Sequence, residues 1–128
     1  MTEDNKQLKI LLIDDDHFLL DMYLLKFKKY GILVDTSPNS ITALESIRGG
    51  KVYDIVLVDI IMPGMDGLDF MTTIRSEKLL PKAVFIILTN ETDSKEKTKN
   101  LGVLGYIIKA TATPSEVVEQ VLEIYKNK

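Results

Sequence analysis

The chain has 128 residues, 45% apolar and 27% charged, a composition typical of one globular domain with a sizeable hydrophobic core. Its 19 acidic and 16 basic residues give a net charge of -3, which argues against nucleic acid as a direct partner because duplex binding needs a basic face. The chain has no cysteine, its first residues are polar, and no apolar run reaches the roughly 20 residues of a membrane span, so we expect a soluble, cytoplasmic protein without disulfides or thiolate metal sites.

Five apolar runs follow one another along the chain, and most are rich in valine and isoleucine, as buried strands are. They cover residues 8–13, 32–36, 54–59, 83–89 and 105–109. Helices are expected between and after these runs, at about residues 16–30, 40–48, 68–74, 91–100 and 113–125. The fourth of these helices is almost wholly polar and is the least strongly indicated.

Helix ends and buried helix faces also follow from the sequence. Gly31 is a C-terminal cap for the first helix, and Thr113, Pro114 and Glu116 form a capping-box pattern at the start of the last. Apolar side chains at helical spacing mark the faces expected to be buried. These are Leu20, Leu24 and Phe27; Ile41, Leu44 and Ile47; Leu68, Met71 and Ile74; and Val117, Val121 and Tyr125.

Regular alternation of strand and helix predicts the fold class. Such a pattern is typical of an α/β domain with a parallel sheet, right-handed crossovers and helices on both faces. With five strands the expected arrangement is flavodoxin-like, with strand order 2-1-3-4-5. We expect a single domain over residues 1–128, with no repeat or linker.

Polar residues that could bind a ligand or react lie at the ends of the predicted strands. The first strand ends in Asp14, Asp15 and Asp16, the third in Asp59, the fourth in Thr89 and the fifth in Lys109. Parallel strands deliver their carboxyl ends to one edge of a sheet, where ligands bind near the point at which the strand order reverses.

The expected strand order makes the first and third strands neighbours, about 4.8 Å apart. Their carboxylates would then suit Mg²⁺, which relieves the repulsion among adjacent aspartates. A hydroxyl and an ammonium beside such a site would hold a phosphoryl group, and Asp59 lies where it could act as a nucleophile and form an aspartyl phosphate.

These segments, in this order and spacing, resemble the receiver domain of two-component response regulators over essentially the whole chain. The matching stretches are "ILLIDDD", "VLVDIIMPGMDG", "IILTN" and "GYIIK". The resemblance implies that Asp59 accepts a phosphoryl group and that Mg²⁺ is held by Asp14, Asp15, Asp59 and the backbone carbonyl of Ile61. It implies that the phosphoryl group contacts Thr89 and Lys109, and that the switch consists of Thr89 and Tyr106. Asp16 lies outside the metal set and is expected to cap the first helix.

The resemblance also implies the partners of the domain. The phosphoryl donor would be a sensor histidine kinase or a phosphotransfer protein, and a stand-alone receiver would signal through a separate output protein, with dimerisation on phosphorylation as one route. It would not act as an enzyme, on nucleic acid directly, or at a membrane.

Three residues depart from the family pattern. Ala110 follows the lysine where the family usually has a proline after a cis bond; a cis bond to a non-proline residue costs about 2.5–4 kcal/mol, so we expect a trans bond. Asn90 replaces a small residue after the threonine and is expected to narrow the entrance to Asp59 or to add a hydrogen bond near the phosphoryl group. Apolar Ile61 positions no attacking water, which predicts slow loss of the phosphoryl group.

Two other functions fit parts of the sequence. A haloacid-dehalogenase-like phosphohydrolase would use Asp14 and Asp16 as its D-x-D pair, although Phe18 stands where that motif has Thr or Val. A phosphate-independent interaction module of the same fold is the second alternative. Asn90 and Ala110 are the residues that favour it.

Overall fold

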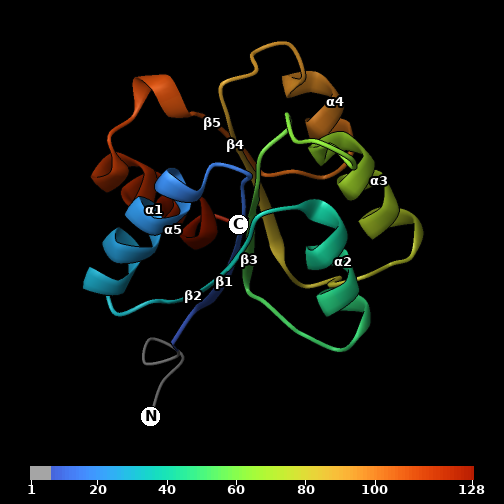
Figure 1. Ribbon diagram of the computed structural model, residues 1–128, viewed down its shortest axis with the longest axis horizontal. Coiled ribbons are helices and arrows are strands. Elements are labelled where there is room, and N and C mark those ends of the chain that lie inside the picture. Colours follow the sequence, from blue (N-terminus) through green and yellow to red (C-terminus); the bar gives the residue numbers. More distant parts are fainter. Residues whose placement is uncertain (1–6) are drawn as a thin grey trace.

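The computed structural model describes residues 7–128, which form a central parallel sheet covered by helices on both faces (Figure 1). The strand order is β2-β1-β3-β4-β5, so the predicted order is confirmed. The strands are β1 (Lys9–Ile13), β2 (Leu33–Ser37), β3 (Ile55–Val58), β4 (Val84–Thr89) and β5 (Gly105–Ile108). The helices are α1 (His17–Lys29), α2 (Ser40–Arg48), α3 (Gly67–Ser76), α4 (Lys95–Asn100) and α5 (Pro114–Lys126), with a short 3₁₀ turn over Lys109–Thr111.

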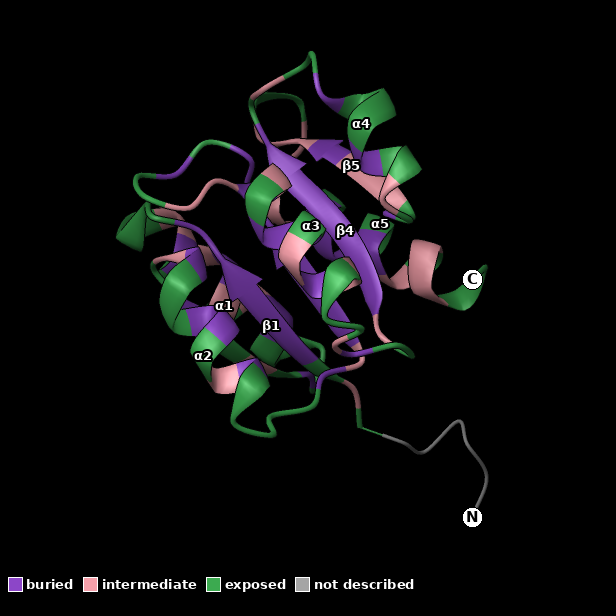
Figure 2. Ribbon diagram, turned by 90° about the vertical axis from the view of Figure 1, so that its right-hand side faces the viewer, coloured by how far each residue is buried: buried purple, intermediate pink, exposed green. Residues whose placement is uncertain are grey.

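The sheet separates two apolar clusters. Helices α1 and α5 lie on one face, and α2, α3 and α4 lie on the other (Figure 1). Every residue of β3 and β4 is buried, which explains why their sequences are continuous apolar runs. Edge strand β2 is mostly exposed, and its sequence is correspondingly mixed. In Figure 2 the buried strands β1 and β4 lie beneath helices whose outer surfaces are exposed.

The predicted helix faces are confirmed in outline, but Leu68 and Tyr125 are only half-buried, and the faces of α1 and α2 differ from the prediction. Helix α1 buries Tyr23 fully, whereas Leu24 is only half-buried. Helix α2 leaves Ile41 51% exposed and buries Ala43 instead. The buried face of α2 consists of positions i, i+3, i+4 and i+7, counted from Ser40. Half of these residues are small, so a prediction based only on large apolar residues placed the centre of the face wrongly.

Helix termini agree well with the sequence. Asp16 caps α1 by accepting the N–H of Leu19 at 3.1 Å, and both bonds of the capping box join Thr113 and Glu116 at the start of α5. Gly31 adopts a φ of +74° just after α1, as a left-handed C-terminal cap requires. Helix α4 is shorter than expected because residues 91–94 form a loop before it.

Gly67, the first residue of α3, makes a close approach to the end of β3. A Cβ atom at this position would lie 2.3 Å from the carbonyl oxygen of Asp59 and 2.9 Å from the Cα of Ile60. Its N–H donates to the Ile60 carbonyl at 2.9 Å. Only glycine therefore lets α3 begin against the backbone that carries Asp59.

Candidate functional site

The polar residues predicted at the strand ends meet at one edge of the sheet. Asp14 directly follows β1, Asp59 directly follows β3, Thr89 is the last residue of β4, and Lys109 directly follows β5. The parallel ladder extends one step past β1 and β3, where the Asp14 N–H donates to Ser37 and the Asp59 N–H donates to Ile13. Backbone pairing thus positions both aspartates at the point where the strand order reverses.

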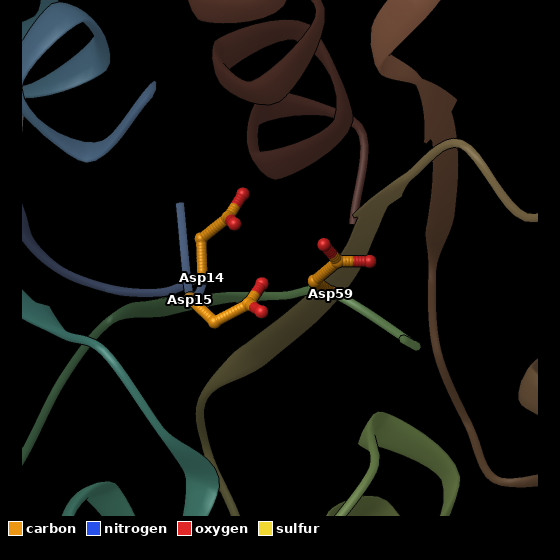
Figure 3. A group of neighbouring side chains, drawn as sticks. All are labelled: Asp14, Asp15 and Asp59. Atoms are coloured by element: carbon orange, nitrogen blue, oxygen red, sulfur yellow. The ribbon is translucent and has the colours of Figure 1, made fainter. Parts of the chain in front are cut away.

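Three carboxylates converge there (Figure 3). One oxygen atom from each of Asp14, Asp15 and Asp59 lies within 4.8 Å of the other two. Asp14 and Asp59 are buried, with 1% and 6% of their surfaces exposed, while Asp15 is exposed to solvent. Like charges at this spacing inside a protein need a compensating cation.

Lys109 supplies a positive charge to this cluster. Its Nζ lies 2.6 Å from Asp14 Oδ2 and 2.7 Å from Asp59 Oδ2, and little of its side chain is exposed. The sequence placed Lys109 beyond Asp59, and its ion pair with Asp14 was not expected. Burial raises the pKa of Asp14 although Lys109 opposes this effect. Burial lowers the pKa of Lys109, but its bonds to Asp14 and Asp59 outweigh that effect and leave the pKa raised.

Both carboxylate oxygens of Asp59 have hydrogen-bond donors. Oδ1 accepts the Thr89 hydroxyl at 2.6 Å and the Ile61 N–H at 3.3 Å. Oδ2 accepts the Lys109 ammonium at 2.7 Å. The site therefore brings together Asp59, Thr89 and Lys109 as the sequence predicted.

A second chain of contacts leads from Thr89 to Tyr106. The N–H of Glu91 donates to the Thr89 hydroxyl oxygen at 3.2 Å, and the half-buried Tyr106 donates its hydroxyl to the carbonyl of Glu91. Glu91 was not recognised in the sequence because it takes part mainly through its backbone. Tyr106 is thus connected to Thr89 through one residue.

The two unusual residues of the sequence bond to each other. Asn90 Oδ1 accepts the backbone N–H of Ala110 at 2.8 Å, which joins the loop after β4 to the turn after β5. The predicted trans bond before Ala110 is confirmed, since residues 7–128 contain no cis peptide bond. Asn90 lies beside the site, as expected, but its partner was not foreseen.

The acidic cluster has the composition of a site for a hard divalent cation. Carboxylate oxygens are the ligands that Mg²⁺ prefers, and it commonly takes only one or two of them while keeping waters. The exposed position of Asp15 leaves one side of the cluster open to solvent. Ile61, which is 62% exposed, lies two residues beyond Asp59 at the same edge.

A parallel sheet of this order, with acidic residues, a threonine and a lysine at its carboxyl edge, defines the class of α/β phosphorelay switches. A family model described as "Response regulator receiver domain" matches residues 10–122. The chain belongs to this family, and it is a receiver domain of the CheY-like kind. Members of the family bind Mg²⁺ at an acidic cluster and interact with histidine kinases or phosphotransfer proteins.

Individual relatives agree with this assignment. The chain is 29% identical to chemotaxis protein CheY-3 of Vibrio cholerae over 124 residues, which cover 93% of this chain and 95% of that protein. It is 30% identical over 105 residues to the transcriptional regulatory protein CseB of Streptomyces coelicolor, covering 80% of this chain but only 43% of CseB. Receiver domains of this kind thus occur both alone and as parts of larger proteins.

Solved structures share the fold. The chemotaxis protein CheY4 of Vibrio cholerae superimposes with a TM-score of 0.80 at 23% identity, covering 93% of this chain and 99% of that one. The response regulator TrrA of Thermotoga maritima superimposes with a TM-score of 0.78 at 28% identity, covering 92% and 99%. Within residues 7–128, no helix is both long and apolar enough to cross a bilayer.

The phosphohydrolase interpretation is not supported. The family match assigns the chain to the receivers, and Asp16, the second acid of the supposed D-x-D pair, caps α1. Asp14, the first acid of that pair, is engaged by Lys109 and by the N–H of Asp16.

Proposed function

We propose that Asp59 is the phosphoryl acceptor of this receiver, that the donor is a sensor histidine kinase or a phosphotransfer protein, and that the output passes through a separate protein. The observation that carries this proposal is the pair of donors on the buried Asp59 carboxylate, the Thr89 hydroxyl at 2.6 Å and the Lys109 ammonium at 2.7 Å. Both are groups that would also bind phosphoryl oxygens.

The metal in this proposal is Mg²⁺. Its ligands would be the carboxylates of Asp14, Asp15 and Asp59 together with the backbone carbonyl of Ile61. When bound, it would supply positive charge to the phosphoryl oxygens. The structure of TrrA, solved in complex with Mg²⁺ and a beryllium fluoride, supports this choice of ion for a related fold.

Phosphoryl transfer from a phosphohistidine would proceed by attack of an Asp59 carboxylate oxygen on phosphorus. The P–O bond forms as the P–N bond breaks, and the released imidazole takes up a proton. Thr89 and Lys109 would transfer their hydrogen bonds from the carboxylate to the new phosphoryl oxygens. This exchange leaves neither donor without a partner.

The switch would run from Thr89 to Tyr106. A shift of Thr89 toward the phosphoryl group would act on Glu91, whose N–H and carbonyl bond to Thr89 and Tyr106 respectively. Tyr106 would then repack at the face formed by α4 and β5. Phosphorylation-driven dimerisation through that face is one form that the output could take.

We also propose that residues 1–128 act as one domain in the cytoplasm, where they take up phosphate stoichiometrically without turning over a substrate. The net charge of -3 favours a protein as the output partner over nucleic acid.

The test is intact mass after incubation with acetyl phosphate and Mg²⁺. We expect one phosphoryl adduct in the wild type and none in Asp59→Asn. Asp21→Asn, the same change at an exposed position of α1, serves as the control and should retain the adduct. A folded wild-type protein without an adduct would refute the proposal and favour the phosphate-independent interaction module.

A further inference from the structure

The hydrogen bond between Asn90 and Ala110 joins the residues that follow Thr89 and Lys109, the two residues whose side chains donate to Asp59. Asn90 follows Thr89, and Ala110 follows Lys109. Strand pairing between β4 and β5 ends where Thr89 pairs with Ile108. The side-chain bond at 2.8 Å therefore joins the two segments just beyond the last backbone pair of this edge.

The bond also completes the turn that carries Lys109. Residues Lys109–Thr111 form a 3₁₀ turn, and the first N–H groups of such a turn have no acceptor within it. Asn90 Oδ1 accepts one of them, the N–H of Ala110. This donor exists only because residue 110 is not a proline, which has no N–H.

From this geometry we infer that Asn90 is a positioning residue for Lys109: it fixes the turn after β5 so that the Lys109 ammonium is directed at Asp59. The inference rests on the proposed phosphorylation of Asp59. Asn90 need not contact the phosphoryl group, because it acts through the backbone next to Lys109.

The same bond links the movements of the two segments that carry Thr89 and Lys109. Thr89 and Lys109 hold opposite oxygens of Asp59, and the bond between the residues that follow them ties their backbones together. A shift of Thr89 toward a phosphoryl group would therefore be transmitted to the turn that carries Lys109. Thr89 and Lys109 would reach the phosphoryl oxygens together.

The first measurement tests the bond in the protein without metal or phosphate. Loss of one hydrogen bond of about 1 kcal/mol should speed amide exchange at Ala110 about fivefold in Asn90→Ala. Asn90→Asp keeps an acceptor oxygen at the same distance along the side chain and should retain the protection. Asn100→Ala, the same truncation at an exposed residue of α4, should leave the exchange at Ala110 unchanged. Equal exchange at Ala110 in wild type and Asn90→Ala would overturn the inference.

The second measurement is the rate of adduct formation at increasing acetyl phosphate concentration with saturating Mg²⁺. Displacement of Lys109 should lower the maximal rate of Asn90→Ala roughly tenfold to a hundredfold. Asn90→Asp should recover most of that rate while needing more acetyl phosphate for half-saturation, because its charge repels the anionic donor. Asn100→Ala should match the wild type.

The outcomes separate this inference from the proposed function. A wild-type protein that forms no adduct refutes phosphorylation of Asp59 and this inference with it. A phosphorylated wild type whose maximal rate is unchanged in Asn90→Ala refutes only the role of Asn90. A faster Asn90→Ala would also refute it, since the asparagine would then act as an obstacle at the entrance to Asp59.

Discussion

Replacement of Lys109 by methionine tests the electrostatics of the site most directly. The substitution keeps a long unbranched side chain but leaves the buried carboxylates of Asp14 and Asp59 without the ammonium that lies 2.6 and 2.7 Å from them. Removing one partner of a buried ion pair costs about 3–5 kcal/mol. In a domain of this size that loss would lower the Tm by roughly 10–20 °C.

The stability lost in Lys109→Met should increase with pH. Burial already raises the pKa of Asp14 and Lys109 opposes this effect, so without Lys109 the pKa of Asp14 in the folded variant should rise further above that of the unfolded chain. A group with a raised folded pKa stabilises the fold at low pH, and that contribution is lost as pH rises through the folded pKa. The difference in free energy of unfolding between wild type and Lys109→Met should therefore increase from pH 5 to pH 8.

The assay is urea denaturation with a chelator at several pH values, repeated with Mg²⁺. A cation that binds the folded state at 100 times its Kd adds about 2.7 kcal/mol, so Mg²⁺ should restore much of the lost stability. The control is Lys82→Met, the same change at an exposed residue near the opposite edge of the sheet. A metal-free Lys109→Met protein as stable as wild type at pH 8 would refute this account of the site.

Four further results are expected. Gly67→Ala should cost about 3 kcal/mol in urea denaturation, because its Cβ would lie 2.3 Å from the carbonyl oxygen of Asp59; a cost below about 1 kcal/mol would contradict this close approach. Thr113→Ala should lose about 1 kcal/mol of stability. Hydrogen bonds from Thr113 hold the pKa of Glu116 below its usual range, so Glu116→Gln should be less stable than wild type at pH 7, and this difference should shrink as pH falls through the lowered pKa; a difference that stays constant as the solution is acidified would count against it. Ile61→Asn should shorten the phosphoryl lifetime by positioning a water, and an unchanged decay in the mass assay would show that Ile61 does not set the lifetime.

The sequence was sufficient to predict the fold and the position of the acidic cluster. Every strand except the edge strand β2 is mainly an apolar run with a polar residue at or just after its end, so the strand ends were visible to within one or two residues. Parallel topology then brings Asp14, Asp59, Thr89 and Lys109 to one edge whatever the details of the loops.

Contacts that depend on loop geometry or on flexible side chains were not predictable. Lys109 has a long side chain, and nothing in the sequence indicates that its ammonium reaches Asp14 as well as Asp59. The bond between Asn90 and Ala110 joins a side chain to a backbone N–H twenty residues away, in a turn whose shape the sequence does not specify. Small residues such as Ala43 carry too weak an apolar signal to mark the true face of α2.

The close approach of Gly67 to Asp59 has a consequence for the evolution of signal duration. Residues 61–66 form a loop whose two ends are joined by backbone contacts, including the bond from the Gly67 N–H to the Ile60 carbonyl. Side chains within the loop can therefore be exchanged without moving Asp59. If Asp59 takes up the phosphoryl group as proposed, substitutions at loop residues such as Ile61 would change how long a signal persists and leave the residues that start the signal in place.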